Sequence, residues 1–303
     1  MFRVTVLGSS AALPTRSRGV SSIALEREGE LLLFDCGEGT QRQMTVARLS
    51  RFEPDVIFIS HIHGDHTLGL FGLLMSMSMH DRRSPVRIVG PDRLKKLIVE
   101  VFRILGTKLT FTVEFVHAKD GLVHRGAGYR VRAIRTEHPG ECYGYRLDED
   151  RRPGKFFPDR AVALGISPGP IFRKLQNGRA VEVGGSRITP EMVMGPPRRG
   201  RSFGYSGDTR PARRLVTFFK GVDLLAFDTT FSDEYATEAR QFGHSTASES
   251  AMLAERAGVK TLLMTHISQR VADATILLEQ AKKIHPDSVV AEDLMQFDVP
   301  LPR

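Results

Sequence analysis

Six consecutive residues constrain this chain more than any other part of its sequence. His61-Ile62-His63-Gly64-Asp65-His66 directly follows residues 55–60, a run typical of a buried β-strand. Four side chains that can bind a metal ion, His61, His63, Asp65 and His66, therefore fall within one short segment. In an extended loop the first three would project to one side and His66 would turn away, so that the segment could serve two adjacent cations. The alternative is a surface cluster of histidines.

Three further candidate ligands also stand just past strand-like runs. His138 follows residues 129–134, Asp208 follows 202–207, and His266 follows 260–265. In open α/β sheets functional groups gather at the carboxyl ends of the strands, so residues distant in sequence can converge there. Each of the three could alone be a capping or turn residue. Together with the six-residue motif they predict one metal centre.

The ligand types indicate the metal and the chemistry. Imidazole and carboxylate groups without thiolate suit zinc, with manganese as the alternative, and one shared carboxylate could hold two ions about 3.5–4 Å apart. Such a pair lowers the pKa of a shared water toward neutrality and stabilises charge on a phosphoryl or carbonyl oxygen. The predicted reaction is a hydrolysis.

Alternating apolar runs and helix-like stretches indicate the fold class. We expect buried strands at residues 4–7, 31–34, 56–59, 86–89, 224–227 and 262–264. We expect helices at residues 41–49, 68–79, 93–105, 212–219, 245–257 and 272–284. This alternation favours α/β layers over a β-sandwich or a helix bundle.

Cysteine usage and hydropathy bear on location. Cys36 and Cys142 are the only two cysteines and have no CxxC spacing, so neither a disulfide framework nor a cysteine zinc cage is expected. No apolar run approaches the roughly 18 residues that span a bilayer, and the N-terminus lacks the pattern of a signal peptide. We therefore expect no membrane association and a cytoplasmic location.

The segment 148–200 differs from the rest of the chain. It contains several Pro-Gly, Asn-Gly and Gly-Gly pairs among sparse apolar residues, which indicates an insertion outside the core. The net charge of the protein is +8, and residues 146–201 hold twelve Lys or Arg against six Asp or Glu. The segment is either a solvated, mobile loop or a basic surface for a polyanion.

Motifs along nearly the whole chain resemble those of the metallo-β-lactamase superfamily and, within it, the ribonuclease Z family. The six-residue motif is typical of the superfamily, while Gly243-His244-Ser245-Thr246-Ala247 and the insertion resemble ribonuclease Z. Other matching pieces are Phe34-Asp35-Cys36-Gly37-Glu38-Gly39, Tyr205-Ser206-Gly207-Asp208-Thr209-Arg210-Pro211 and Thr265-His266. The resemblance implies a single domain over residues 1–303, an αββα four-layer sandwich, with a basic, flexible arm at 147–189 that binds tRNA.

The resemblance also implies the role of each ligand. His61, His63 and His138 would hold one zinc, Asp65, His66 and His266 would hold the other, and Asp208 would bridge them. Asp65 would in addition orient the attacking hydroxide. Asp35, in the turn after residues 31–34, would support the metal-binding loops or be a plain turn residue.

The catalytic and substrate-binding residues follow from the same resemblance. His244 would act on the leaving oxygen with support from Asp228, which stands where the family has Glu. Arg16 and Arg18 would sense the RNA 3′ end from a loop that reads Pro14-Thr15-Arg16-Ser17-Arg18-Gly19, with Arg for the family's Lys and Gly for its Asn. Lys155, Arg173 and Lys174 of the arm would contact the substrate.

The implied function is a zinc-dependent endoribonuclease that cleaves 3′-extended precursor tRNA just after the discriminator base. The family is usually a homodimer in which the arm of one subunit serves the active site of the other. Two alternatives stay open: a small-molecule phosphodiesterase or arylsulfatase-like hydrolase of the same fold, and a catalytically silent RNA-binding member. A basic arm argues against the first, and the full set of candidate ligands argues against the second.

Overall fold

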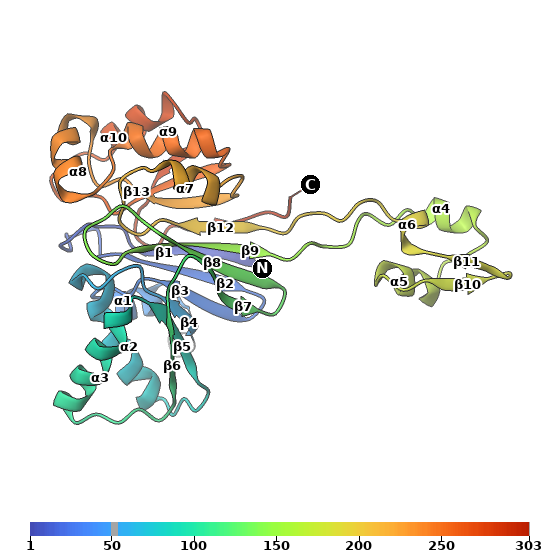
Figure 1. Cartoon of the computed structure of the whole chain (residues 1–303), viewed down its shortest axis with the longest axis horizontal. Helices are drawn as coiled ribbons and strands as arrows, with labels where there is room; N and C mark the ends of the chain where they lie inside the picture. Colours follow the sequence, from blue (N-terminus) through green and yellow to red (C-terminus); the bar gives the residue numbers. More distant parts are fainter. Residues whose placement is uncertain (50–53, 303) are drawn as a thin grey trace. The chain divides into compact units, whose positions relative to one another are not determined.

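The computed structural model of this protein describes residues 1–49 and 54–302. The chain divides into two compact units (Figure 1). The first comprises Met1–Asp148 and Ser202–Pro300, and the second is centred on Glu149–Arg201. All seven predicted metal ligands lie in the first unit. In the part of the chain described, no helix is both long and apolar enough to cross a membrane.

The first unit contains two seven-stranded sheets. One has the order β16-β1-β2-β3-β4-β5-β6, antiparallel from β16 to β3 and parallel from β3 to β6. Its strands are β1 (Phe2–Gly8), β2 (Ser22–Arg27), β3 (Glu30–Phe34), β4 (Pro54–Phe58), β5 (Val86–Gly90), β6 (Val113–His117) and β16 (Gln296–Asp298).

The other sheet has the order β15-β14-β13-β12-β9-β8-β7, parallel from β15 to β12. Strand β9 then pairs antiparallel with β12, and β7 pairs antiparallel with β8. The strands are β7 (Gly121–Gly126), β8 (Tyr129–Arg135), β9 (Tyr143–Glu149), β12 (Ser202–Tyr205), β13 (Leu224–Asp228), β14 (Thr261–Thr265) and β15 (Ser288–Val290).

Helices cover the outer face of each sheet, and Figure 1 shows them on opposite sides of the pair. The first sheet is covered by α1 (Thr40–Val46), α2 (Gly64–Met79) and α3 (Asp92–Leu105), and the second by α7 (Arg213–Phe218), α9 (Ala247–Ala257) and α10 (Thr275–Lys282). The 3₁₀-helix η1 (Asp233–Tyr235) leads into α8 (Ala236–Phe242). This αββα order of layers confirms the predicted fold class.

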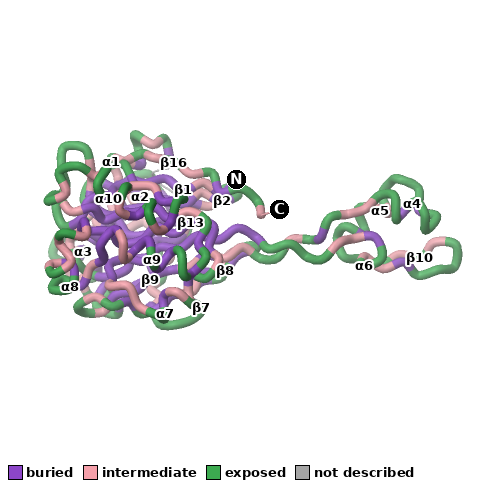
Figure 2. Tube along the Cα trace, turned by 90° about the horizontal axis from the view of Figure 1, so that it is seen from above, coloured by how far each residue is buried: buried purple, intermediate pink, exposed green. Residues whose placement is uncertain are grey.

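Three apolar cores separate the four layers, which explains why the central strands are apolar without interruption. In β3, Leu32 and Phe34 face the core between the sheets, whereas Leu31 and Leu33 face the helices. Successive side chains of a strand point to opposite faces, so a strand buried on both faces needs apolar residues at every position. In Figure 2 the buried part of the trace follows these strands.

The predicted strands and helices lie within or overlap observed elements, but one boundary was wrong in a way that affects the site. The helix expected from residue 68 begins at Gly64, and His63 is its extended N-cap residue (φ −62°, ψ 152°). Asp65 and His66 therefore occupy the first helical turn and not an extended loop. An acidic residue is favoured there by the helix dipole.

The second unit has its own secondary structure. It contains α4 (Pro158–Ala163), α5 (Pro170–Gln176), a hairpin of β10 (Val181–Val183) and β11 (Ser186–Ile188), and α6 (Pro190–Val193). A small core of Ala161, Ile166, Leu175, Ile188 and Val193 holds these elements together. The insertion expected at residues 148–200 is thus a small folded unit, which ends at Arg201 because β12 begins at Ser202.

Candidate metal centre

All seven predicted ligands converge at one end of the two sheets. His61 and His63 lie between β4 and α2, Asp65 and His66 lie in the first turn of α2, and His138, Asp208 and His266 follow β8, β12 and β14. Several of them line a cavity of about 470 Å³, which His244 lines as well. The order of parallel strands in each sheet brings these distant segments to the same edge.

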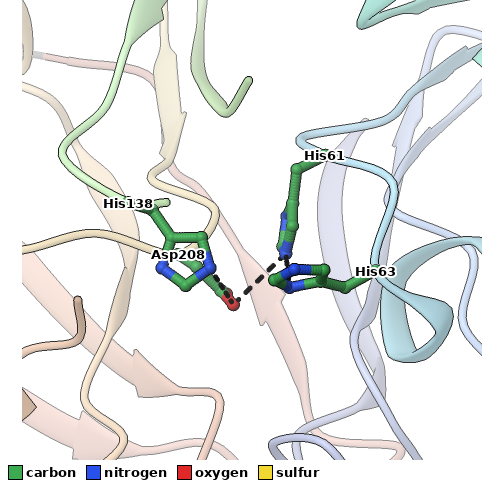
Figure 3. A group of neighbouring side chains, drawn as sticks. All are labelled: His61, His63, His138 and Asp208. Atoms are coloured by element: carbon green, nitrogen blue, oxygen red, sulfur yellow. Dashed lines mark hydrogen bonds and ion pairs between the residues drawn. The ribbon is translucent and has the colours of Figure 1, made fainter. Parts of the chain in front are cut away.

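One group consists of His61, His63, His138 and Asp208, whose candidate ligand atoms all lie within 4.8 Å of one another. Figure 3 shows the four side chains directed toward a common space. His61 Nε2 lies 2.8 Å from His63 Nδ1 and 3.5 Å from Asp208 Oδ2, and His138 Nε2 lies 3.9 Å from the same oxygen.

The second group consists of Asp65, His66 and His266. Asp65 Oδ2 lies 3.3 Å from Nε2 of each histidine, and the two Nε2 atoms are 3.3 Å apart. Asp208 Oδ1 lies 3.4 Å from both of these nitrogens. Asp208 therefore directs Oδ2 to the first group and Oδ1 to the second, as a bridging carboxylate would.

The ligand atoms at this site are better arranged to bind divalent cations than to form hydrogen bonds with one another. Among the described residues, His138 Nε2 and Asp208 Oδ1 are buried and have no hydrogen-bond partner. Burial lowers the pKa of His61 and of His138, which favours the neutral rings that bind metal. Unpaired buried acceptors and ring nitrogens that face each other are stabilised by a shared cation, and this set of imidazoles and carboxylates is suited to zinc.

The other ring nitrogen of each candidate ligand histidine in the second group is held by a neighbour. His66 Nδ1 lies 2.6 Å from Asp35 Oδ2, and His266 Nδ1 lies 2.8 Å from the hydroxyl of Thr230. Such contacts fix the ring and leave Nε2 for a metal. Asp35 also accepts hydrogen bonds from the Tyr205 hydroxyl at 2.6 Å and from the Ser60 hydroxyl and amide at 2.7 and 2.6 Å. Asp35 is thus a support for His66 and not a plain turn residue.

The first group has similar support. The Ser60 hydroxyl lies 3.0 Å from His61 Nδ1, and His138 Nδ1 lies 3.1 Å from the Gly243 carbonyl oxygen. In the second group, Asp65 Oδ2 accepts a hydrogen bond of 2.9 Å from the amide of Ala12, whose φ of 57° is in the left-handed region. Sequence reasoning missed Ser60, Thr230 and Ala12, because a single hydroxyl or amide carries no recognisable pattern.

His244 contacts Asp228 beside the two groups. Its Nδ1 lies 2.8 Å from Asp228 Oδ2, and its ring stacks on His266 with centroids 5.1 Å apart. Burial lowers the pKa of His244, but the adjacent Asp228 carboxylate outweighs burial and raises the pKa to about 9. A raised pKa favours the protonated ring, which can donate a proton.

The predicted substrate-binding residues lie in different surroundings. The Arg18 guanidinium donates to the Ser9 hydroxyl at 2.7 Å and to the Ala291 carbonyl, so it anchors its own loop, while Arg16 is exposed. In the second unit Lys155, Arg173 and Lys174 are all exposed. These side chains are available to a polyanion, whereas Arg18 would first have to leave its partners.

Known proteins resemble the chain in sequence and in structure. A family model described as "Anti-Pycsar protein Apyc1" matches residues 2–150. Ribonuclease Z of Methanosarcina acetivorans is 47% identical over 302 residues, which cover 99% of each chain. Ribonuclease Z of Archaeoglobus fulgidus is 41% identical over 99% of this chain and 98% of its own.

Solved structures agree with the sequence comparison. The crystal structure of the short form of human tRNase Z superimposes with a TM-score of 0.71 at 25% identity, covering 98% of this chain and 99% of the human one. The metallo-β-lactamase fold protein YhfI from Bacillus subtilis gives a TM-score of 0.70 at 19% identity over 98% of this chain and all of its own, which shows the fold alone. With the metallo-β-lactamase fold and this identity over nearly its whole length, the chain belongs to the ribonuclease Z family.

Proposed function

We propose that this protein is a metal-dependent endoribonuclease that cleaves 3′-extended precursor tRNA just after the discriminator base. The products would be a tRNA with a free 3′ hydroxyl and a trailer with a 5′ phosphate. One observation carries the proposal: six histidine and aspartate side chains converge around Asp208 in a chain that is 47% identical to a ribonuclease Z.

We propose two zinc ions as the cofactor, with manganese as the alternative. His61, His63 and His138 would hold one ion, Asp65, His66 and His266 the other, and Asp208 both. When bound, such a pair supplies a nucleophilic hydroxide near neutral pH and stabilises charge on a phosphoryl oxygen. The two oxygens of Asp208 reach nitrogens of different groups at 3.4 and 3.5 Å, which supports the bridging role.

Two further roles fall to side chains of the protein: one orients the attacking water, and the other protonates the leaving oxygen. Asp65, held by the Ala12 amide at 2.9 Å, orients the attacking water. His244 donates its Nε2 proton to the departing 3′ oxygen, while Asp228 holds Nδ1–H and balances the ring's charge. Since the attack is in line, the acid and the nucleophile act on opposite sides of phosphorus.

The substrate partner, the assembly and the location belong to the same proposal. The second unit would bind precursor tRNA through exposed basic residues that include Lys155, Arg173 and Lys174, and Arg16 would contact the RNA near the cut. We further propose a homodimer in which this unit serves the partner's active site. A cytoplasmic location stays a prediction.

The direct test is to incubate the purified, zinc-loaded protein with a 3′-extended precursor tRNA and to map the new 3′ end. We expect a single cut after the discriminator base, no cut in mature tRNA, and no cut by an Asp208→Ala variant. A zinc-loaded protein that hydrolyses small phosphodiesters but leaves the precursor intact would instead support the small-molecule hydrolase. A protein that binds the precursor and cleaves neither substrate would support a silent RNA-binding member.

A further inference from the structure

We propose that Arg210 is a positioning residue for His244. Its guanidinium binds the backbone carbonyl of His244 and also Glu249 in the first turn of helix α9. The inference rests on the proposed function, in which His244 gives a proton to the leaving oxygen. Arg210 lies two residues after Asp208, on the segment that follows β12. Its side chain reaches across to the residues that precede α9.

The guanidinium of Arg210 contacts two groups at once. Nη1 donates to the carbonyl oxygen of His244 at 2.6 Å and to Glu249 Oε2 at 2.6 Å, and Nη2 donates to Glu249 Oε1. The two charged side chains are only 19% and 18% exposed. The bidentate pair fixes the plane of the guanidinium relative to the plane of the carboxylate. The remaining hydrogen bond, from Arg210 to the His244 carbonyl, is therefore held in one direction.

Glu249 connects this pair to the helix start. It is the third residue of α9, its carboxylate accepts the amide of Thr246 at 3.0 Å, and Thr246 is the N-cap that accepts the Glu249 amide. This reciprocal arrangement is a capping box. The Ser245 hydroxyl also donates to the Thr209 carbonyl at 2.7 Å. Two consecutive residues after His244 are therefore joined to the segment that carries Arg210.

Three polar contacts, together with the stacking of its ring on His266, hold His244 in place. The amide of His244 donates to the Ala239 carbonyl at 2.8 Å, its carbonyl accepts from Arg210, and Nδ1 contacts Asp228. Asp228 sets the ring plane, but the backbone bonds set the point from which the ring extends. The positive charge of Arg210 is already paired with Glu249. Its contacts therefore indicate a positioning role and not the binding of an RNA phosphate.

A double-mutant cycle tests the proposal. Steady-state and single-turnover cleavage of precursor tRNA are measured for Arg210→Met, His244→Ala and the double variant, with zinc content determined for each. A displacement of about 1 Å can cost about a hundredfold in rate, so we expect Arg210→Met to lower kcat about ten- to a hundredfold while KM and zinc stay near wild type. On the His244→Ala background the same change should cost nothing further, because the residue it positions is absent.

Matched variants separate positioning from other roles. Arg213→Met, at an exposed arginine three residues further on, should leave kcat unchanged. Arg210→Lys keeps the charge without the planar fork and should recover only part of the rate. Hydrolysis of an aryl phosphodiester, whose leaving group departs as a stable anion, should be little changed by Arg210→Met, since that reaction needs no proton from His244.

The contrary outcomes are distinct. An equal loss on both backgrounds would overturn the inference, as would a raised KM with unchanged kcat and a smaller salt dependence, which would make Arg210 a phosphate ligand. Wild-type kcat in His244→Ala alone would instead reject the acid role in the proposed function. If Arg210→Met does not fold, Arg210→Lys and Glu249→Gln complete the same cycle.

Discussion

His244 Nδ1 lies 2.8 Å from Oδ2 of Asp228, and Asp228 has no exposure to solvent. The carboxylate also accepts the amide of Thr209 at 2.8 Å and the hydroxyl of Thr230 at 2.7 Å. Since Thr230 in turn contacts His266 Nδ1 at 2.8 Å, one buried carboxylate links the proposed acid to a candidate metal ligand. Aspartate, shorter by one methylene than the glutamate that the sequence resemblance implied, still reaches the histidine.

Replacing His244 should affect the chemical step and little else. His244→Ala is expected to lower kcat for precursor tRNA by at least about a hundredfold, the usual contribution of a general acid. KM and bound zinc should stay close to wild type, because the interaction is made in the transition state and His244 is not among the proposed ligands. Single-turnover kinetics with parallel metal analysis check this. Near-normal kcat would assign His244 a structural role through its contact with Asp228.

Asp228→Asn should shift the pH dependence. Burial lowers the pKa of His244 and Asp228 raises it, to about 9, so the active, protonated ring is present below this pH and is lost as pH rises through it. Without the carboxylate charge the pKa falls, and the alkaline limb of the kcat profile should move to lower pH with a smaller loss of rate than in His244→Ala. An unmoved limb would mean that another group delivers the proton.

Asp208→Ala should remove both metal ions together. Each carboxylate oxygen lies within 3.5 Å of a nitrogen in a different ligand group, so neither group keeps its full set. Elemental analysis of the purified variant should find both ions depleted, against close to two per wild-type chain. His63→Ala is the matched control, because His63 belongs to one group only and the other ion should be retained. Retention of one ion in Asp208→Ala would rule out a bridging carboxylate.

Removing the second unit should weaken RNA binding and spare the chemistry. The backbones of Arg152 and Arg198 exchange hydrogen bonds of 2.8 and 2.9 Å, so residues 153–197 can be replaced by a short glycine linker at that point. We expect a higher KM for precursor tRNA and a flatter salt dependence, since fewer phosphates are neutralised. Hydrolysis of a small aryl phosphodiester should continue at its full rate. Equal loss of both activities would make the unit part of the catalytic domain.

Patterned features were predictable from the sequence, and isolated contacts were not. Strands buried on both faces, such as β3 and β13, are unbroken apolar runs, and the ligands follow strand ends. Strand β2 has only three apolar residues between polar ends, and the edge strand β7 has only two beside polar residues and glycines, so no comparable signal marks them. The folding of the second unit was also missed, because its core of five small or aliphatic residues is spread over residues 161–193 among glycines and prolines.

The side chain of Asp35 makes four contacts, and those with His66 and Tyr205 can be separated by substitution. Asp35→Asn keeps the shape but removes the carboxylate charge that faces His66 Nδ1 and turns an amide toward a donor, so zinc affinity should fall about 10–100-fold. Tyr205→Phe is the control, since it removes one of the donors and leaves the contact with His66. It should cost about 1.5–3 kcal/mol of stability, as expected for a hydrogen bond to a charged group, with little change in zinc affinity. Competition with a chelator measures the affinity, and thermal unfolding of the metal-free protein measures the stability. Equal zinc affinity in Asp35→Asn and wild type would show that His66 is oriented by the start of helix α2 and not by Asp35.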